Sequence, residues 1–109
     1  MARMTRVNSF TAPPDYRDRL IAHLMRIRDT LCDCRSAFNV RLLAAADGEI
    51  VLIYEHVGRA GAAECASFLD SRHAPEDRHA ALLALKAQMS VRSYHPVEEV
   101  APAIVPKER

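Results

Sequence analysis

Alternating apolar and polar residues predict two neighbouring strands in the middle of the chain. Between residues 38 and 44 the two kinds alternate, with Asn39 and Arg41 on the polar side. The apolar side comprises Phe38, Val40 and Leu42. Asp47-Gly48 follows, a dipeptide typical of hairpin turns in which both central residues take positive φ. Residues 50–54 are then apolar at every position, so we expect both faces of this second strand to be covered.

Apolar residues at helical spacing predict three helices. The longest stripe runs from Tyr16 to Leu31 and repeats every three or four residues, the period of an amphipathic helix. Pro13 and Pro14 precede it and suit a first helical turn, where an N–H is not needed. Two further helices are expected at 62–69 and 75–88, and two weaker strands at 5–10 and 90–95. The last helix would place Leu82, Leu85 and Met89 on one stripe.

The expected order of elements is β-α-β-β-α-β, the order of an α+β ferredoxin-like fold. Residues 4–100 would form one domain, and residues 101–109, which are rich in proline, an extended or disordered tail. The helices of such a unit cover one face of the sheet, whereas the strand at 50–54 needs cover on both. A second copy packed sheet against sheet is the simplest cover, so we expect a homodimer.

Composition and charge exclude several kinds of partner. The 109 residues suffice for one domain, and a formal net charge of +1 offers no basis for nucleic-acid binding. No stretch approaches the ~20 apolar residues that a membrane-spanning helix needs, so a membrane partner is not expected. The three cysteines are an odd number, which favours reduced thiols and a cytoplasmic protein.

The chain lacks the usual sequence patterns of metal and cofactor sites. Cys32 and Cys34 stand two residues apart, without a second pair or a histidine at ligand spacing, which makes a poor zinc site. The three glycines, Gly48, Gly58 and Gly61, form no phosphate-binding loop. We therefore expect no metal and no organic cofactor.

Two segments resemble a known family. The hairpin strand DGEIVLIYEHV (residues 47–57) and the segment SFLDSRHAPEDRHAALLAL (residues 67–85) are similar to the antibiotic biosynthesis monooxygenase-like domain of the dimeric α/β-barrel superfamily. The resemblance covers about residues 4–100. It implies a homodimer with a pocket between sheet and helices in each subunit, and an aromatic small molecule as substrate. Val57-Gly58-Arg59 stands where the family often has tryptophan followed by Glu-Ser, and the chain has no tryptophan.

The resemblance also suggests catalytic residues. Asn8 lies on the first strand, where haem-degrading relatives carry an asparagine, and its amide would bind a substrate oxygen or dioxygen. Tyr54 and either His73 or His79 would complete the set, with the histidine moving a proton from a phenol. Each also has a plain structural explanation: a solvent-facing amide, a packed core tyrosine, or surface histidines.

Three other residues are candidate substrate contacts. Arg41 could hold an anionic or phenolate substrate, or form an interfacial ion pair. His56 shares a strand face with Tyr54, either in a cavity or as a packed core pair. Phe68 stands where relatives carry a tryptophan.

Three functions remain open at this stage. The first is a small cofactor-independent oxygenase, or a related tailoring enzyme, acting on an aromatic polyketide-type substrate. The second is a haem-binding or haem-degrading protein, with Asn8 near the haem and His79 as axial ligand. The third is a dimeric binding module without catalysis.

Overall fold

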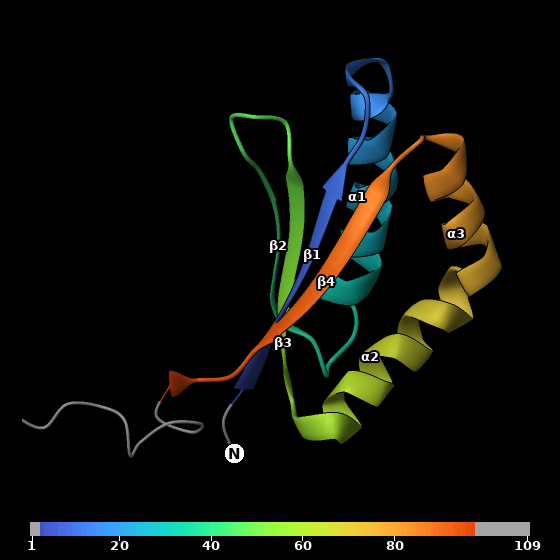
Figure 1. Ribbon diagram of the computed structural model, residues 1–109. Coiled ribbons are helices and arrows are strands. Elements are labelled where there is room, and N and C mark those ends of the chain that lie inside the picture. The colour runs from blue at the N-terminus through green and yellow to red at the C-terminus, as the bar shows by residue number, and fades with distance from the viewer. Residues whose placement is uncertain (1–2, 98–109) are drawn as a thin grey trace, which may run out of the picture.

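Four antiparallel strands form a single sheet, and helices lie along one of its faces in the computed structural model, which describes residues 3–97 (Figure 1). The elements in chain order are β1 (Arg3–Thr11), the 3-10 turn η1 (Pro14–Tyr16), α1 (Arg17–Cys32), β2 (Phe38–Ala44), β3 (Ile50–Val57), α2 (Gly58–Arg72), α3 (Pro75–Ala84) and β4 (Gln88–Tyr94). The expected tail at 101–109 lies outside the described residues.

The strand order is β2-β3-β1-β4, which confirms the predicted α+β ferredoxin-like class. The crossover through α1 leaves room for one strand between β1 and β2. The hairpin after β2 places β3 in that gap, antiparallel to both neighbours. Asn8 therefore lies opposite Leu52 on one side and opposite Val91 of β4 on the other.

The two faces of the sheet differ in burial because one of them carries the helices. Along β3 the even-numbered residues are buried and the odd-numbered ones half-buried. The buried side packs against α1, which contributes the fully buried Leu20, Leu24 and Leu31. The opposite side, which we call the open face, carries no helix in the described part of the chain. Its apolar residues include Val7, Phe38, Leu43, Val51, Ile53 and Tyr94.

A bulge in β2 overturns the simple alternation expected there. The pairing shifts between Phe38, opposite Glu55, and Arg41, opposite Ile53, so one extra residue is inserted on β2. Asn39 absorbs it in the left-handed region at φ 52°, a conformation that asparagine tolerates better than most residues. Phe38 consequently shares the open face with Arg41 and not with Leu42.

The hairpin turn also differs from the expectation. Only Gly48 has positive φ, at 102°, and Asp47 does not. The Gly48 N–H donates to the Ala45 carbonyl, and the Asp47 carboxylate accepts from the Glu49 N–H. These bonds describe a three-residue loop that ends in a left-handed glycine, the second common hairpin type.

The end of α3 comes earlier than the apolar stripe indicates. The helix ends at Ala84, and Lys86 takes φ 54° without being a glycine. The Lys86 N–H donates to the Leu83 carbonyl and the Ala87 N–H to the Leu82 carbonyl, which is how a left-handed residue closes a helix. Met89 therefore belongs to β4, and the helical stripe predicted through it was wrong.

Among residues 3–97, no helix combines the length and apolar character needed to cross a membrane.

Candidate functional site

A cavity of about 240 Å³ lies between the helix-covered face of the sheet and helices α2 and α3. Its apolar walls come from the sheet and from helices α1 and α2. They comprise Phe10, Leu31, Leu52, Leu69, Met89 and Val91. Met89 and Val91 of β4 stay 53% and 39% exposed, so the cavity is open beside this edge strand. Its polar lining consists of Arg6, Asn8, Tyr54, Cys65, Asp70 and Arg78.

The strand register brings Asn8 and Tyr54 into this cavity together. Arg6 lies opposite Tyr54 and Asn8 opposite Leu52, so all four share the helix-facing side of adjacent strands. Neither the Asn8 amide nor the Tyr54 hydroxyl hydrogen-bonds to another described residue. Both groups line the cavity, so both are free to bind a ligand there.

Tyr54 is an uncharged hydrogen-bonding group near neutral pH. Burial raises its pKa above the ordinary value of 10.0, and the charges of Arg6 and Arg78 oppose that effect only in part. Its ring lies tilted beside that of His56, with centroids 6.3 Å apart. Tyr54 can therefore donate a hydrogen bond to an anion, but it does not supply a base.

Cys65 is buried in the cavity wall and is not a nucleophile. Burial and the neighbouring Cys34 thiol raise the pKa of Cys65 to about 12, so it stays protonated. Cys32 is exposed while Cys34 is buried, so the two thiols of this pair occupy different environments. All three cysteines are free thiols.

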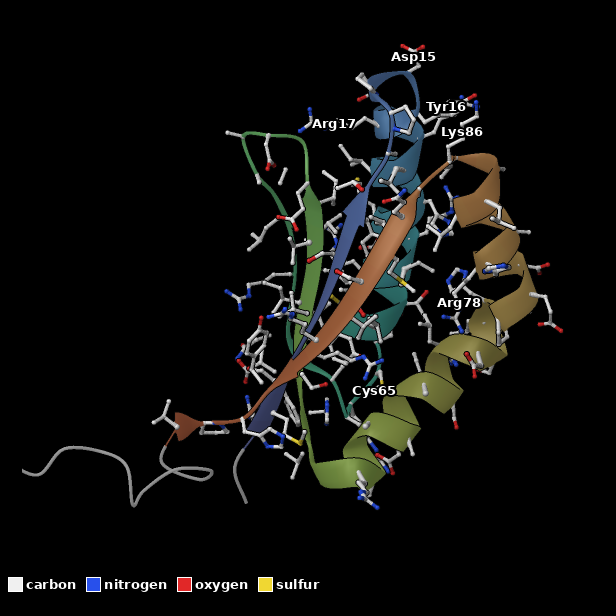
Figure 2. All side chains as sticks on the ribbon, viewed as in Figure 1. Asp15, Tyr16, Arg17, Cys65, Arg78 and Lys86 are labelled. Atoms are coloured by element: carbon white, nitrogen blue, oxygen red, sulfur yellow. The ribbon has the colours of Figure 1, made fainter. Side chains whose placement is uncertain are left out.

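Arg78 is held in a defined position at the start of α3. Its Nε donates to the His73 carbonyl at 3.0 Å, and its guanidinium forms an ion pair with Asp70 of α2. Figure 2 shows Arg78 on the side of α3 that faces the sheet, above Cys65 of α2. Two of its five N–H groups are engaged in these contacts, which leaves donors for a ligand.

The two predicted histidines do not line this cavity. The His73 ring lies 2.7 Å from the Thr30 hydroxyl of α1, and that hydroxyl donates to the Arg26 carbonyl. Since a hydroxyl has one hydrogen, His73 Nε2 must be the donor in the first contact. His79 lines a second cavity of about 170 Å³ between α1 and α3, together with His23. Arg78 and Phe10 line both cavities.

His23 gives the fold a sensitivity to acid. Burial lowers its pKa below the ordinary 6.5, and the charges of Arg26, His73 and Arg78 lower it further. Below pH 6.5 the unfolded chain therefore binds more protons than the folded chain, and folding stability falls as the pH drops toward the folded pKa.

Replacing this histidine should remove part of that loss. We expect His23→Leu to lose less free energy of unfolding than the wild type between about pH 7.5 and about pH 5.5. Urea denaturation at both pH values measures the difference. An equal loss in both proteins would show that His23 does not contribute.

The remaining predicted residues lie away from the cavity. Arg41 is exposed on the open face of the sheet, opposite Ile53. His56 is buried on the helix side, where its Nδ1 lies 3.1 Å from the Gly58 carbonyl. Phe68 lines a separate cavity of about 280 Å³ beside Cys34, and the Arg72 guanidinium lies 3.7 Å from its ring centroid.

The three charged lining residues escaped sequence reasoning: Arg6, Asp70 and Arg78. A signal for Arg6 was present, because residues 6 and 8 of a strand share a face. Asp70 and Arg78 lie eight positions apart across a helix break, and nothing in the sequence alone shows that they pair.

Metal and haem sites find little support in the described residues. Within residues 3–97, no group of three or more histidine, cysteine, aspartate or glutamate side chains could hold a metal ion. The residues of the haem alternative are separated: Asn8 and His79 line different cavities, and Phe68 lines neither.

The fold resembles that of several solved structures, although sequence comparisons find no significant match. No protein-family model matches the chain, and no curated protein is significantly similar to it in sequence. Rv0793 from Mycobacterium tuberculosis matches it with a TM-score of 0.68 at 22% identity, over 92% of this chain and 100% of its own.

Two further relatives carry functional names. SnoaB from Streptomyces nogalater, a cofactor-independent oxygenase, matches with a TM-score of 0.66 at 13% identity, over 93% of this chain and 99% of its own. A Deinococcus radiodurans protein, provisionally named an antibiotic biosynthesis monooxygenase, matches with a TM-score of 0.67 at 12% identity, over 85% and 91% respectively. The chain therefore has the fold of the antibiotic biosynthesis monooxygenase-like domains.

Proposed function

We propose that this protein is a small oxygenase that uses neither metal nor organic cofactor and acts on a phenolic, polycyclic aromatic compound of polyketide type. The observation that carries the proposal is the placement of two free hydrogen-bonding groups, Asn8 and Tyr54, in one apolar-walled cavity. Among the structural relatives, SnoaB supports the proposal because it shares the fold and is named a cofactor-independent oxygenase.

The substrate is its own reductant in this chemistry. An anthrone-type compound has a methylene group between two aromatic rings, and removal of a proton leaves an electron-rich anion. That anion passes an electron to dioxygen, and the carbon radical and superoxide so formed combine in a carbon–oxygen bond. The peroxide anion takes up the proton removed earlier, and loss of water from the hydroperoxide leaves a carbonyl. One methylene and one O₂ thus give one carbonyl and one H₂O, so no external electron donor is needed.

The cavity supplies what this sequence of steps requires from a protein. The Asn8 amide and the neutral Tyr54 hydroxyl can donate hydrogen bonds to the oxygen on which negative charge develops. The apolar walls reduce the contact of that anion with water. Asp70 is the carboxylate in this lining, so it takes the role of proton acceptor that sequence reasoning had assigned to a histidine.

Consumption of dioxygen tests the proposal directly. Dithranol, a dihydroxyanthrone, should be converted to the corresponding anthraquinone with one O₂ consumed for each molecule, faster than in the presence of heat-denatured protein. Conversion should stop under nitrogen. Binding without oxygen consumption in air would overturn the oxygenase and leave a cyclase, an isomerase or a module without catalysis as the function.

We also propose that two copies pair through the open face, in a protein whose thiols stay reduced in the cytoplasm. The apolar side chains of this face include Leu43 and Tyr94, each 47% exposed in the single chain. Apolar side chains exposed in this way are stabilised when another surface covers them. A second identical face would cover them symmetrically.

A further inference from the structure

From the charges in the cavity, we infer that the ligand carries a carboxylate that is held by Arg6 of β1 and Arg78 of α3. This inference rests on the proposed function in one respect, namely that the cavity binds an aromatic compound. It adds the chemical class of the preferred substrate: a polycyclic phenol that also carries a carboxylate.

Arg6 is a cation without a carboxylate partner. It lies on the helix-facing side of a central strand and lines the cavity, and it forms no ion pair with a described residue. Arg3, three residues earlier on the same strand and on the open face, differs because it pairs with Glu55 at 3.4 Å. A half-buried guanidinium beside an apolar wall is stabilised when an anion binds to it.

Arg78 brings a second cation to the same cavity from the opposite layer. Asp70 and the His73 carbonyl hold its guanidinium in place, so little side-chain freedom is lost when a ligand binds. Arg6, Arg78 and Tyr54 line the same cavity, and the positive charges of both arginines lower the pKa of Tyr54. Figure 2 shows Arg78 directed from α3 toward the sheet that carries Arg6.

The charge balance of the lining favours an anion. Two arginines face one carboxylate, Asp70, and that carboxylate is already paired with Arg78. Tyr54 and Cys65 remain neutral because their pKa values are raised. The lining therefore carries one positive charge in excess, and a planar carboxylate matches the fork of guanidinium donors.

Asn8 and Tyr54 stay available to the reacting part of the ligand under this arrangement. Arg6 lies opposite Tyr54 in the sheet, so a carboxylate held there places the attached rings along Leu52 and Leu69. The carboxylate would thus orient the ring system, while the two neutral donors serve the oxygen that becomes charged.

A matched pair of probes tests the inference. Rhein is a dihydroxyanthraquinone with a carboxylate, and aloe-emodin is the same ring system with a hydroxymethyl group in its place. We expect the wild type to bind rhein more tightly than aloe-emodin by roughly ten- to a hundred-fold, the usual effect of hydrogen bonds to a charged group. Isothermal titration at neutral pH measures both dissociation constants.

Variants locate the carboxylate. Arg6→Gln and Arg78→Gln should each remove most of the preference for rhein and leave the affinity for aloe-emodin nearly unchanged. Arg59→Gln, which removes an exposed charge on α2 outside the cavity lining, should keep the preference. Because Arg78 also supports the break between α2 and α3, Arg6→Gln and the charge-retaining Arg6→Lys keep the test valid if Arg78→Gln does not fold.

The outcomes separate this inference from the proposed function. Equal binding of the two compounds, or a preference for rhein that persists in Arg6→Gln, would overturn the inference while the cavity still binds aromatic rings. Failure of both compounds to bind would overturn the inference and the proposed aromatic pocket together. Oxygen consumption with dithranol, which lacks a carboxylate, reports on the proposed function alone.

Discussion

Asn8→Ala should lower kcat by about 10²–10³-fold, the usual cost of removing one donor aimed at a developing oxyanion. The Asn8 side chain lines the cavity and hydrogen-bonds to no described residue, so its loss should leave folding nearly unchanged. Initial rates of dithranol oxidation measure the effect, and thermal unfolding confirms that the variant is folded. We expect kcat to fall more than KM rises, because the interaction strengthens as charge develops.

A neighbour on the same strand provides the control. Ser9 follows Asn8 and points to the open face, so Ser9→Ala removes a similar small polar group on the other side of the sheet. Its kcat should stay within about twofold of the wild type. If Asn8→Ala is equally active, the amide takes no part in the reaction and the proposed chemistry is wrong.

The fold could be predicted from sequence because its elements have strong and separate patterns. The helical stripe of α1 and the apolar run of β3 have different periods, and their order allows few arrangements of the chain. Two of the errors fell where one residue took an unusual backbone conformation. Asn39 and Lys86 both adopt positive φ without being glycine. Asn39 changes which side chains of β2 share a face, and Lys86 ends α3 early.

The candidate site was only partly predictable, for a related reason. Asn8 and Tyr54 meet because strand register follows from alternation, and alternation is visible in the sequence. The histidines at 73 and 79 flank a helix break whose direction is not visible there. In the structure this break turns the His73 ring toward Thr30 of α1 and leaves Arg78 facing the cavity.

Ile53→Asp should convert a dimer into monomers. Ile53 lies on the central strand β3 on the open face, half-buried in the single chain, opposite Val7 of β1 and Arg41 of β2. Covering it with a second copy would take an aspartate out of water, which costs several kcal/mol even with Arg41 opposite it on β2. Light scattering at micromolar concentration should give twice the 12.2 kDa chain mass for the wild type and the single-chain mass for the variant.

Two other variants make this result specific to the open face. Leu43→Asp changes an open-face residue that is already 47% exposed in the single chain, so it should fold and still weaken the dimer even if Ile53→Asp does not fold. Ala63→Asp places the same charge on an exposed position of α2 and should remain dimeric. A wild-type mass near 12.2 kDa would show that the open face is not covered by a second copy. A dimer that persists in both open-face variants would place the interface elsewhere, and the exposure of Leu43 and Tyr94 would then need a different explanation.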